Sequence, residues 1–598
     1  MASLPLSATT TTVPIATSSI IFSPSFTPTK ICKTSKHKRF YKVSCKTLDD
    51  NNYQDPKLII PSKYEKGSMD IIDRRNVLIG LGGYSASTLL SNPLAFAAPI
   101  AAPDLSKCGA PDLPEGTMPI NCCPPKTNKI VDFIPPQSNT MRVRPAAHLV
   151  DEKYLAKFSK ALQLMKDLPD ADPRSFKNQA NVHCAYCDGA YEQVGFPDLE
   201  LQVHNSWLFF PFHRCYLYFF EKILGKLIDD PNFAVPFWNW DFPNGMVMPG
   251  LYTNPTSPFY DKLRDAAHQP PVTIDLGYNG TDEEVTPDQQ ILNNLTIMYR
   301  QMVSSAKTPG LFFGSSYRAG DDPDPGAGTI ESTPHGPVHV WCGDRTQPNG
   351  ENMGIFYSAG RDPIFYGHHS NVDRLWTIWK TLGGKRKDIT DSDWLNSEFI
   401  FYDENAQLVK IKVKDCLDTK KLGYIYQEVD VPWIQSKPTP KFSKIMRKIK
   451  KSTVAMADDN VIPLATEVFP RKLDRVLRVM VKRPKKSRSK REKEEEEEIL
   501  VIEGIEVAKD AFVKFDVFIN DEQEETIGAD KTEFAGSFVH VPHKHKHGEK
   551  TKTRLRLGIN DLLEDLGAED DDGVLVTLVP KKGAGDVTIG GIKIEFEK

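Results

Sequence analysis

The sequence predicts a mainly α-helical domain followed by a small all-β domain. Three segments before residue 383 carry apolar residues three and four positions apart, which is typical of amphipathic helices. After about residue 400, and most clearly beyond 467, short runs alternate apolar and polar residues between turn residues, as strands do. A chain of 598 residues is long enough to give each domain its own core.

The helical domain is expected to span residues 98–435. Its predicted helices are DEKYLAKFSKALQLMKDLP, WLFFPFHRCYLYFFEKILGKLI and HHSNVDRLWTIWKTL, at 151–169, 207–228 and 368–382. The stretch 317–336 is rich in Pro, Gly and Asp and predicts a long loop that leads into a further helix. The end of the domain, 390–435, alternates as strands do.

A linker at 436–466 separates this domain from the β domain at 467–598. Seven alternating runs, among them VLRVMVKRP, EILVIEGIEV, FVKFDVFIN and VLVTLVP, predict a sandwich or jelly roll. The charged run KKSRSKREKEEEEE at 485–498 is expected to be a solvated loop.

Two targeting signals precede the helical domain. Residues 1–45 contain no Asp or Glu and many Ser and Thr, the composition of an organelle transit peptide. Within 46–97, Arg74 and Arg75 precede a short apolar stretch and the sequence LAFA, which indicates a twin-arginine transfer segment cut after Ala97. Signals in this order predict a chloroplast protein sent to the thylakoid lumen; a disordered N-terminal extension is the alternative.

Composition excludes some classes of function. Residues 1–97 carry 12 basic and 6 acidic residues, so their removal changes the formal net charge from −4 to −10, which does not favour nucleic-acid binding. The apolar stretch at 77–90 is too short and too weakly apolar to span a bilayer. We therefore expect no integral membrane span, and at most a loose association with thylakoids.

Ten cysteines are present, and eight of them lie outside the signals. Cys108, Cys122 and Cys123 lie in a Pro-rich segment with little periodicity, where disulfides would supply order in an oxidising compartment. Adjacent cysteines do not easily bond each other, so one of the three needs a partner beyond this segment, and Cys184 is a candidate. The motif HCAYC at 183–187, by contrast, would usually suggest a zinc site.

The histidines that matter for chemistry fall into two groups of three, which suggests two metals. The first group is in the helical block around 183–213, and the second is in the block around 335–369: His183, His204 and His213, then His335, His339 and His369.

Helical phase decides part of this grouping. His335 and His339 are four apart and share one helix face, whereas His204 and His213 are nine apart and out of phase on a continuous helix. Phase alone does not choose between His368 and His369. The tract HVPHKHKHG at 540–548 also has a four-residue His spacing, but its interleaved lysines predict a solvated loop.

The donor set favours copper. Neutral imidazole suits copper and zinc, whereas hard cations prefer carboxylates. A zinc hydrolase normally has a carboxylate among or beside its ligands, as in HExxH, and neither histidine block has that form. Two neighbouring all-histidine sites therefore favour a redox pair of copper ions.

At this point the sequence resembles the plant polyphenol oxidases, the chloroplast catechol oxidases and tyrosinases with two copper ions. The resemblance extends from the targeting signals to the C-terminus. It rests on the motifs HCAYCDGAY, WLFFPFHRCYLYFFEKIL, AVPFWNWD, YRAGDDPDPGAGTIE, PHGPVHVWCGD, DPIFYGHHSNVDRLW, DSDWL and KFDVFIN. It implies that the helical domain contains a four-helix bundle around both copper ions, with O2 as co-substrate.

The resemblance also assigns ligands and bonds. His183, His204 and His213 match the ligands of the first copper, and His335, His339 and His369 those of the second, which leaves His368 in the core or outside the ligand set. It implies the disulfides Cys108–Cys123 and Cys122–Cys184, and a thioether between Cys187 and His204. The three residues of HCAYC would then have three different tasks.

Three further positions match residues that act on substrate in this family. Phe356 matches the aromatic gate over the metals, and Glu331 matches the acid that holds a water near the second copper. In clear tyrosinases an asparagine often follows the first ligand of the second copper, but this chain has Gly336, so strong monophenol hydroxylation is not expected. Cys215 and Cys342 replace bulkier or hydroxyl residues and are expected to be free thiols.

The resemblance implies an enzyme that oxidises o-diphenols to o-quinones with O2, made in a latent form. The β domain would cover the entrance until an activating protease cuts the linker at 436–466. Two alternatives remain: a dedicated hydroxylase or oxidase of one specialised plant phenolic, such as a lignan or a chalcone, and a reversible O2 carrier. Quinone formation in a catechol assay separates an oxidase from a carrier.

Overall fold

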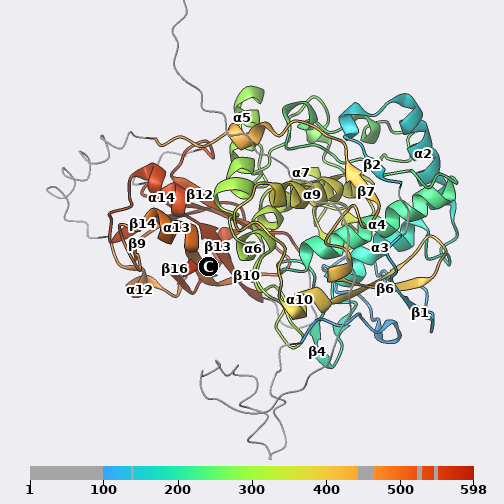
Figure 1. Cartoon of the computed structure of the whole chain (residues 1–598), viewed down its shortest axis with the longest axis horizontal. Helices are drawn as coiled ribbons and strands as arrows, with labels where there is room; N and C mark the ends of the chain where they lie inside the picture. The colour runs from blue at the N-terminus through green and yellow to red at the C-terminus, as the bar shows by residue number, and fades with distance from the viewer. Residues whose placement is uncertain (1–97, 137–139, 442–461, 522–527, 544–549) are drawn as a thin grey trace, which may run out of the picture. The chain divides into compact units, whose positions relative to one another are not determined.

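Helices dominate the first part of the chain, as the spacing of apolar residues predicts. The computed structural model describes residues 98–136, 140–441, 462–521, 528–543 and 550–598; the signals predicted at 1–97 and residues 442–461 of the predicted linker lie outside them. The main helices are α2 (Glu152–Asp167), α3 (Phe176–Cys187), α4 (Phe209–Leu227), α5 (Pro287–Tyr299) and α9 (Ile364–Thr381) (Figure 1). Side chains of Asp151, Ser175 and Thr286 accept hydrogen bonds from the first turns of α2, α3 and α5, which fixes where these helices begin.

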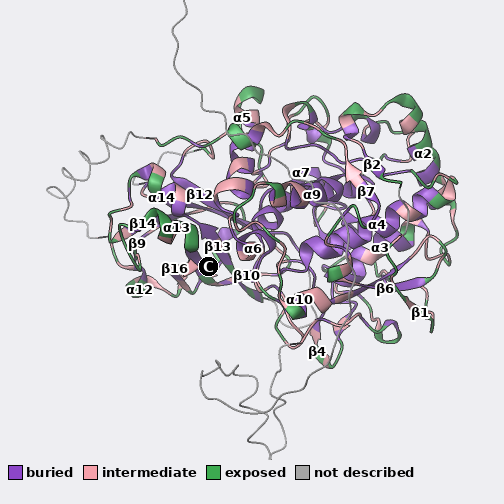
Figure 2. Cartoon of the chain, in the orientation of Figure 1, coloured by how far each residue is buried: buried purple, intermediate pink, exposed green. Residues whose placement is uncertain are grey.

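Helix α4 is the centre of this helical part. It is apolar on nearly all sides, and it packs against α2 and α9 while α3 packs against the short helix α8 (Phe356–Ala359). Figure 2 shows α3, α4 and α9 as largely buried. A helix that is apolar all round belongs in a core. Among the described residues, no helix combines the length and apolar character needed to cross a bilayer.

The loop predicted at 317–336 ends earlier than expected. A helical turn, η7 (Glu331–His335), runs directly into α7 (Gly336–Cys342), and it is kinked at Thr333, whose backbone is not helical, with φ −146° and ψ 125°. Thr333 precedes Pro334, and a residue before proline is disfavoured in the α region. The kink therefore has a local cause.

Short strands tie the N-terminal segment to the end of the helical domain. The predicted strand-rich segment contains β5 (Glu398–Tyr402), β6 (Leu408–Lys412) and β7 (Tyr424–Tyr426). β1 (Ile130–Asp132) pairs in parallel with β6, and β2 (Arg142–Arg144) pairs in parallel with β7. The Pro-rich N-terminal segment is thus held by backbone pairing to a segment about 280 residues later, which the sequence did not predict.

A buried ionic network joins α4, α9 and these strands. Glu221 on α4 accepts hydrogen bonds from Arg142 and Arg144, both at 2.8 Å. Asp373 on α9 pairs with Arg144 at 3.2 Å and with Arg214 of α4, and it also accepts a bond from Tyr424 at 2.6 Å. Burial alone would raise the pKa of Asp373, but the adjacent Arg214 and Arg144 hold it below its ordinary value.

Replacing Asp373 with Ala is expected to cost about 3–5 kcal/mol of unfolding free energy, because it leaves the buried Arg214 without its carboxylate partner and removes one of the two carboxylates that pair with Arg144. Since the folded-state pKa is depressed, the native carboxylate stabilises the fold above its ordinary pKa. That contribution is lost as pH falls through the folded-state value. Urea denaturation at several pH values measures both effects. Asp170→Ala, which breaks the exposed Lys177–Asp170 pair, should change stability by less than about 1 kcal/mol. Equal losses in the two variants would contradict the prediction.

The C-terminal part is all-β, as predicted. One sheet contains β8 (Arg471–Lys472), β10 (Glu497–Ala508), β13 (Lys550–Gly558), β15 (Thr588–Ile589) and β16 (Gly591–Glu597). The other has the order β12 (Phe534–His540), β11 (Val513–Ile519), β14 (Gly573–Pro580), β9 (Leu477–Lys482). The pairings within both sheets are antiparallel, and residues from both sheets share one hydrophobic core. The arrangement is a β-sandwich.

The run 485–498 is largely solvated, as predicted, but only part of it is a loop. Residues Lys490–Glu495 form the short helix α13, capped by Ser489, and the last two glutamates already belong to β10. Glu498 is buried, and its carboxylate pairs with Arg483 at 2.7 Å. The end of this charged run is therefore paired inside the domain and not solvated.

Candidate metal centre

Three histidines from separate elements meet on one side of α4. His183 is on α3, His213 is on α4, and His204 lies in the loop five residues before α4 begins. One nitrogen from each of the three rings lies within 4.8 Å of the others, and all three residues are buried. The loop position of His204 frees it from the helical phase of His213, so the nine-residue spacing no longer separates them.

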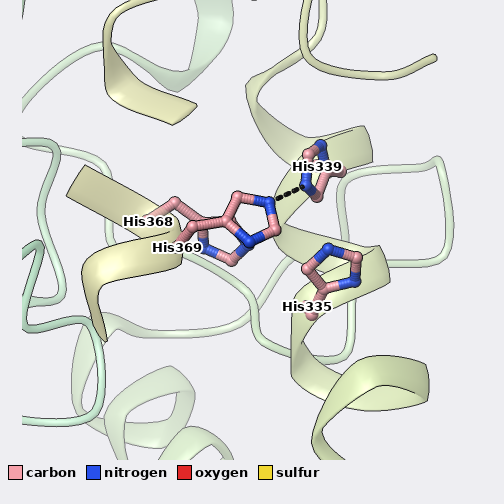
Figure 3. Close-up of side chains that lie close together, drawn as sticks. All are labelled: His335, His339, His368 and His369. Atoms are coloured by element: carbon pink, nitrogen blue, oxygen red, sulfur yellow. Dashed lines mark hydrogen bonds between the residues drawn. The ribbon is translucent and has the colours of Figure 1, made fainter. Parts of the chain in front are cut away.

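A second group lies on η7, α7 and α9. His335 and His339 are one turn apart, with ring centroids 4.5 Å apart, and His369 of α9 faces His339 with 3.2 Å between their Nε2 atoms (Figure 3). His368 is also near enough to offer a nitrogen to this group. The structure therefore brings together the predicted residues and one neighbour.

The two groups touch each other. The rings of His213 and His369 stack with centroids 4.1 Å apart and an interplanar angle of 10°, and those of His204 and His335 are 5.9 Å apart. The contact follows from the packing of α4 on α9. Two metal ions held by these groups would be close neighbours.

Backbone carbonyls fix the orientation of most of these rings. The Nδ1 atoms of His183, His213, His335 and His339 lie 2.8–3.1 Å from the carbonyl oxygens of Phe356, Phe209, Glu331 and Met353, respectively. Because a carbonyl can only accept, Nδ1 carries the proton in each ring and Nε2 keeps its lone pair. The Nε2 atoms of His183, His204, His213 and His335 are buried without a hydrogen-bond partner among the described residues.

Burial keeps these rings neutral. It lowers the pKa of His183 to about 3 and that of His339 to about 4, and it lowers the pKa of the other four predicted ligands well below the ordinary value. Neutral imidazole is the form that binds a metal. Buried lone pairs without partners are costly unless something binds them, so these residues fit a pair of imidazole-bound metal ions.

His368 differs from its neighbour. The indole Nε1 of Trp240 donates to its Nδ1 at 3.2 Å. In the neutral ring the proton must then be on Nε2, which leaves no lone pair there for a metal. The bond gives a physical reason to separate His368 from His369, which helical phase alone could not do.

The donor set fits copper. Each group consists only of imidazoles, without a carboxylate among its members. All-imidazole sites suit copper, and the adjacency of two such groups suits electron transfer from both metals to one small molecule.

An aromatic side chain and an acid flank the first group. Phe356, at the start of α8, stacks on the ring of His204 with centroids 4.0 Å apart. Glu331, buried on η7, accepts a hydrogen bond from the backbone N–H of Asn205 at 2.5 Å. Burial raises the pKa of Glu331 well above its ordinary value. Both residues lie next to His204 or its chain neighbour.

The C-terminal domain covers this place with residues 538–543, here called the covering segment. The ring of His543 stacks on Phe356, with centroids 5.0 Å apart and an interplanar angle of 21°. A Cβ on Gly336 would lie 2.9 Å from Val539 and 3.3 Å from Val541. The solvated loop predicted for 540–548 is therefore wrong at its described end, because His543 is fully buried; residues 544–549 lie outside the described residues.

Both expected disulfides are present, and Cys215 and Cys342 are free thiols as expected, whereas the thioether of Cys187 stays a prediction. Cys108 is bonded to Cys123 and Cys122 to Cys184, which ties the Pro-rich segment to α3. Cys187, Cys215 and Cys342 are buried thiols, as is Cys416. Cys187 is one turn after His183 on α3. The side chain of Gln202 links Cys187 to His204, because it donates to the Cys187 carbonyl at 3.0 Å and accepts from the His204 N–H at 2.9 Å.

Sequence reasoning missed four residues beside the site: Gln202, Asn205, Asp324 and His543. Asp324 lies in the predicted loop but binds Asn205 Nδ2 at 3.1 Å, and Asn205 in turn holds Glu331. Asn205 has a positive φ of 53°, which only the structure shows. Gln202 and Asp324 carry no signal in a single sequence, and His543 stands in the His- and Lys-rich tract that was predicted to be solvated.

Family models match most of the described chain. The common central domain of tyrosinase matches residues 173–382, the polyphenol oxidase middle domain 388–439, and the chloroplastic polyphenol oxidase C-terminal domain 469–596. The first match contains both histidine groups, and the third contains the β-sandwich strands from β8 onward.

Full-length relatives agree with these matches. A chloroplastic polyphenol oxidase of apple (Malus domestica) is 60% identical over 98% of this chain and 98% of its own length. Aureusidin synthase of Antirrhinum majus is 57% identical over 85% of this chain and 92% of its own length. The solved structure of latent apple tyrosinase has a TM-score of 0.74 at 64% identity, and covers 79% of this chain and 100% of that one. The chain belongs to the polyphenol oxidase family, with a tyrosinase-type central domain and the C-terminal domain of the chloroplastic members.

Proposed function

We propose that this protein oxidises o-diphenols to o-quinones with O2 and is made in a latent form. In the balanced reaction, two catechols each lose two electrons and two protons, and one O2 becomes two waters. The observation that carries the proposal is the contact between two buried all-imidazole groups. The similarity to apple polyphenol oxidase along the full chain supports it.

The ligand assignment is part of the proposal. His183, His204 and His213 would hold one copper, and His335, His339 and His369 the other, with α3, α4, α7 and α9 as the four helices of the bundle. Bound copper supplies two neighbouring one-electron couples, which together accept the two electrons of a catechol. A thioether between Cys187 and His204 would lock the His204 ring, and the bridge through Gln202 supports their proximity.

Residues of the chain orient the substrate and move its proton. The ring of Phe356 would stack on the phenol ring and align it over the metals. Glu331 would accept the proton of the substrate hydroxyl through a water, since burial makes its carboxylate a stronger base and the Asn205 N–H keeps it in place. The surrounding apolar and aromatic side chains exclude other water from the site.

Gly336 is proposed to limit monophenol hydroxylation, because it has no side chain to orient that water. Gly336→Asn, in chain cut at the linker and with its cover displaced, should raise the ratio of monophenol to diphenol turnover about tenfold, the effect of roughly one added hydrogen bond. Gly336→Ala adds the Cβ without the amide and should leave the ratio unchanged. Initial rates with a monophenol and its catechol measure the ratio; an equal rise in both variants would refute the role.

Latency is proposed to depend on the domain at 467–598, which would be released after a protease cuts the linker at 436–466. The domains at 98–435 and 467–598 are supported by the family matches on either side. Cutting alone should not free the cover, because Thr439 pairs with 530–532, and Lys441 N–H binds Glu533 at 3.0 Å. These contacts keep the end of the first domain attached to the second.

Location in the chloroplast is supported by the names of the relatives, and transfer to the thylakoid lumen by the twin-arginine motif. The proposed parts 1–45 and 46–97 would be removed on the way. At most a loose association with thylakoids is proposed.

A substrate panel tests the function. Copper-loaded protein, cut at the linker and with its cover displaced, would be given simple catechols, tyrosol-like monophenols and larger phenolics, with O2 consumption and quinone absorbance recorded. Simple catechols are expected to be turned over fastest. A strong preference for one large phenolic would favour the specialised oxidase that the similarity to aureusidin synthase suggests. Oxygen binding without quinone would indicate an O2 carrier and refute the proposal.

A further inference from the structure

The covering segment places an aromatic ring where a phenol ring would bind. His543 lies on one face of Phe356, and the ring of His204 lies in a second stacked contact with Phe356. Phe356 and His543 are both buried. The exposed fraction of Phe356 is 3%, so the cover leaves little of this aromatic surface to solvent.

The ring nitrogen Nε2 of His543 contacts Asp324 of the first domain. Nε2 lies 3.2 Å from Oδ2 of Asp324, and Nδ1 lies 2.8 Å from the carbonyl oxygen of Val541. The segment therefore presents to Phe356 an aromatic ring whose Nε2 lies against the carboxylate of Asp324.

Asp324 is held in place by its own domain. Asn205 Nδ2 donates to Oδ1 of Asp324 at 3.1 Å, and the backbone N–H of Asn205 donates to Glu331. Asp324 is 1% exposed and adopts a positive φ of 62°, which aspartate tolerates better than most residues. Asn205 therefore contacts both this carboxylate and Glu331, the acid proposed to receive the substrate proton.

Lys509 of the C-terminal domain is also influenced by the charge of Asp324. Lys509 is buried, its carbonyl accepts the N–H of His543 at 2.9 Å, and the carboxylates Glu200, Asp324 and Asp112 act on its ammonium group. Burial lowers the pKa of Lys509, and these acids oppose that shift. Three carboxylates of the first domain, one of them Asp324, therefore act on this cation of the C-terminal domain.

We infer that Asp324 is a specificity-determining residue of the uncovered enzyme, which binds the cationic tail of a phenol whose ring stacks on Phe356. The favoured class is catechols with an aminoalkyl substituent, and the disfavoured class is catechols with a carboxyalkyl substituent. The inference deepens the proposed function and rests on it. It follows from the contacts at this position, where a ring stacked on Phe356 also brings a nitrogen to the buried carboxylate of Asp324.

The test compares three catechols that share a ring: 4-(2-aminoethyl)catechol, 4-methylcatechol and 3-(3,4-dihydroxyphenyl)propionic acid. Copper-loaded full chain, cut at the linker and with its cover displaced, would be assayed as wild type, Asp324→Asn and Asp322→Asn. Asp322 is an exposed carboxylate in the same loop, so its variant is a control for the same change of charge.

We expect Asp324→Asn to lower kcat/KM for the amine about 10- to 100-fold, the range for a hydrogen bond to a charged group, mainly through KM. The neutral catechol should change by less than about twofold, the acid should improve, and Asp322→Asn should match the wild type. Ligand binding gives a readout that is independent of turnover. Copper-free protein, cut at the linker and with its cover displaced, should bind phenethylamine more tightly than 3-phenylpropionate, and Asp324→Asn should remove the difference.

Two results would overturn the inference. One is an equal loss of kcat/KM for all three catechols in Asp324→Asn, which indicates a structural role. The other is a wild type that does not discriminate between amine and acid. If the copper-loaded wild type oxidises none of the three, the proposed function itself fails, whereas oxidation of 4-methylcatechol without charge discrimination refutes only the role of Asp324.

Discussion

His339→Ala is expected to remove one copper per chain and to lower catechol oxidation more than about 100-fold. Loss of a residue that merely supports a ligand already costs about 10- to 100-fold in metal affinity or activity, and His339 is a proposed ligand. Its Nδ1 is fixed by the Met353 carbonyl at 2.8 Å, and its Nε2 faces His369 at 3.2 Å.

The matched control is His368→Gln. His368 lies beside His369 on α9 and is equally buried, but its Nδ1 accepts the Trp240 N–H. Copper content by elemental analysis should stay at two per chain in the control and fall to one in His339→Ala. Equal copper loss in both variants would contradict the assignment of ligands, and full copper with unchanged oxidation in His339→Ala would remove the basis of the proposed function.

His543→Ala is expected to raise the activity of the uncut chain about tenfold or more. The substitution removes a stacked aromatic contact worth about 0.5–1.5 kcal/mol and a hydrogen bond to a charged group worth about 1.5–3 kcal/mol. Both contacts join the covering segment to the first domain, so their loss makes opening of the cover less costly. Each 1.4 kcal/mol corresponds to a factor of ten in the open population.

A second substitution separates the two contributions. His543→Phe keeps a ring against Phe356 but cannot bind Asp324, and it should give an activity between those of the wild type and His543→Ala. Oxidation of 4-methylcatechol before and after cutting the linker and displacing the cover measures the effect. The three proteins should be equally active once uncovered; an uncut His543→Ala that remains as inactive as the wild type would show that other contacts hold the cover.

Part of this architecture could be predicted from local pattern. The alternating runs at 498–507, 512–520 and 574–580 became β10, β11 and β14, because strand periodicity depends only on neighbouring residues. The end of the run 485–498 was predicted wrongly for the complementary reason. Whether a charged residue is solvated depends on partners such as Arg483, which pairs with Glu498 across the domain and which no local pattern reveals.

The candidate site shows the same division. The histidines of the two groups could be found from their clustering and from the motifs shared with a family, and the structure gathers them. The separation of His368 from His369 required Trp240, a contact across 128 residues. The approach of His543 to Phe356 and Asp324 required the packing of the C-terminal domain on the first, and its charged, lysine-rich surroundings in the sequence indicated solvent instead.

The sequence by itself determined the order of the helical and β parts, most strands of the sandwich and the residue types that can hold two copper ions. These features follow from short-range periodicity and from the chemistry of imidazole, which a residue carries wherever it lies. The tertiary structure alone decided the parallel pairings β1–β6 and β2–β7, the proton positions on the histidine rings and the burial of His543 beside Asp324. Each of these depends on groups brought together from distant parts of the chain, where burial and hydrogen bonding, not sequence spacing, set the free energy.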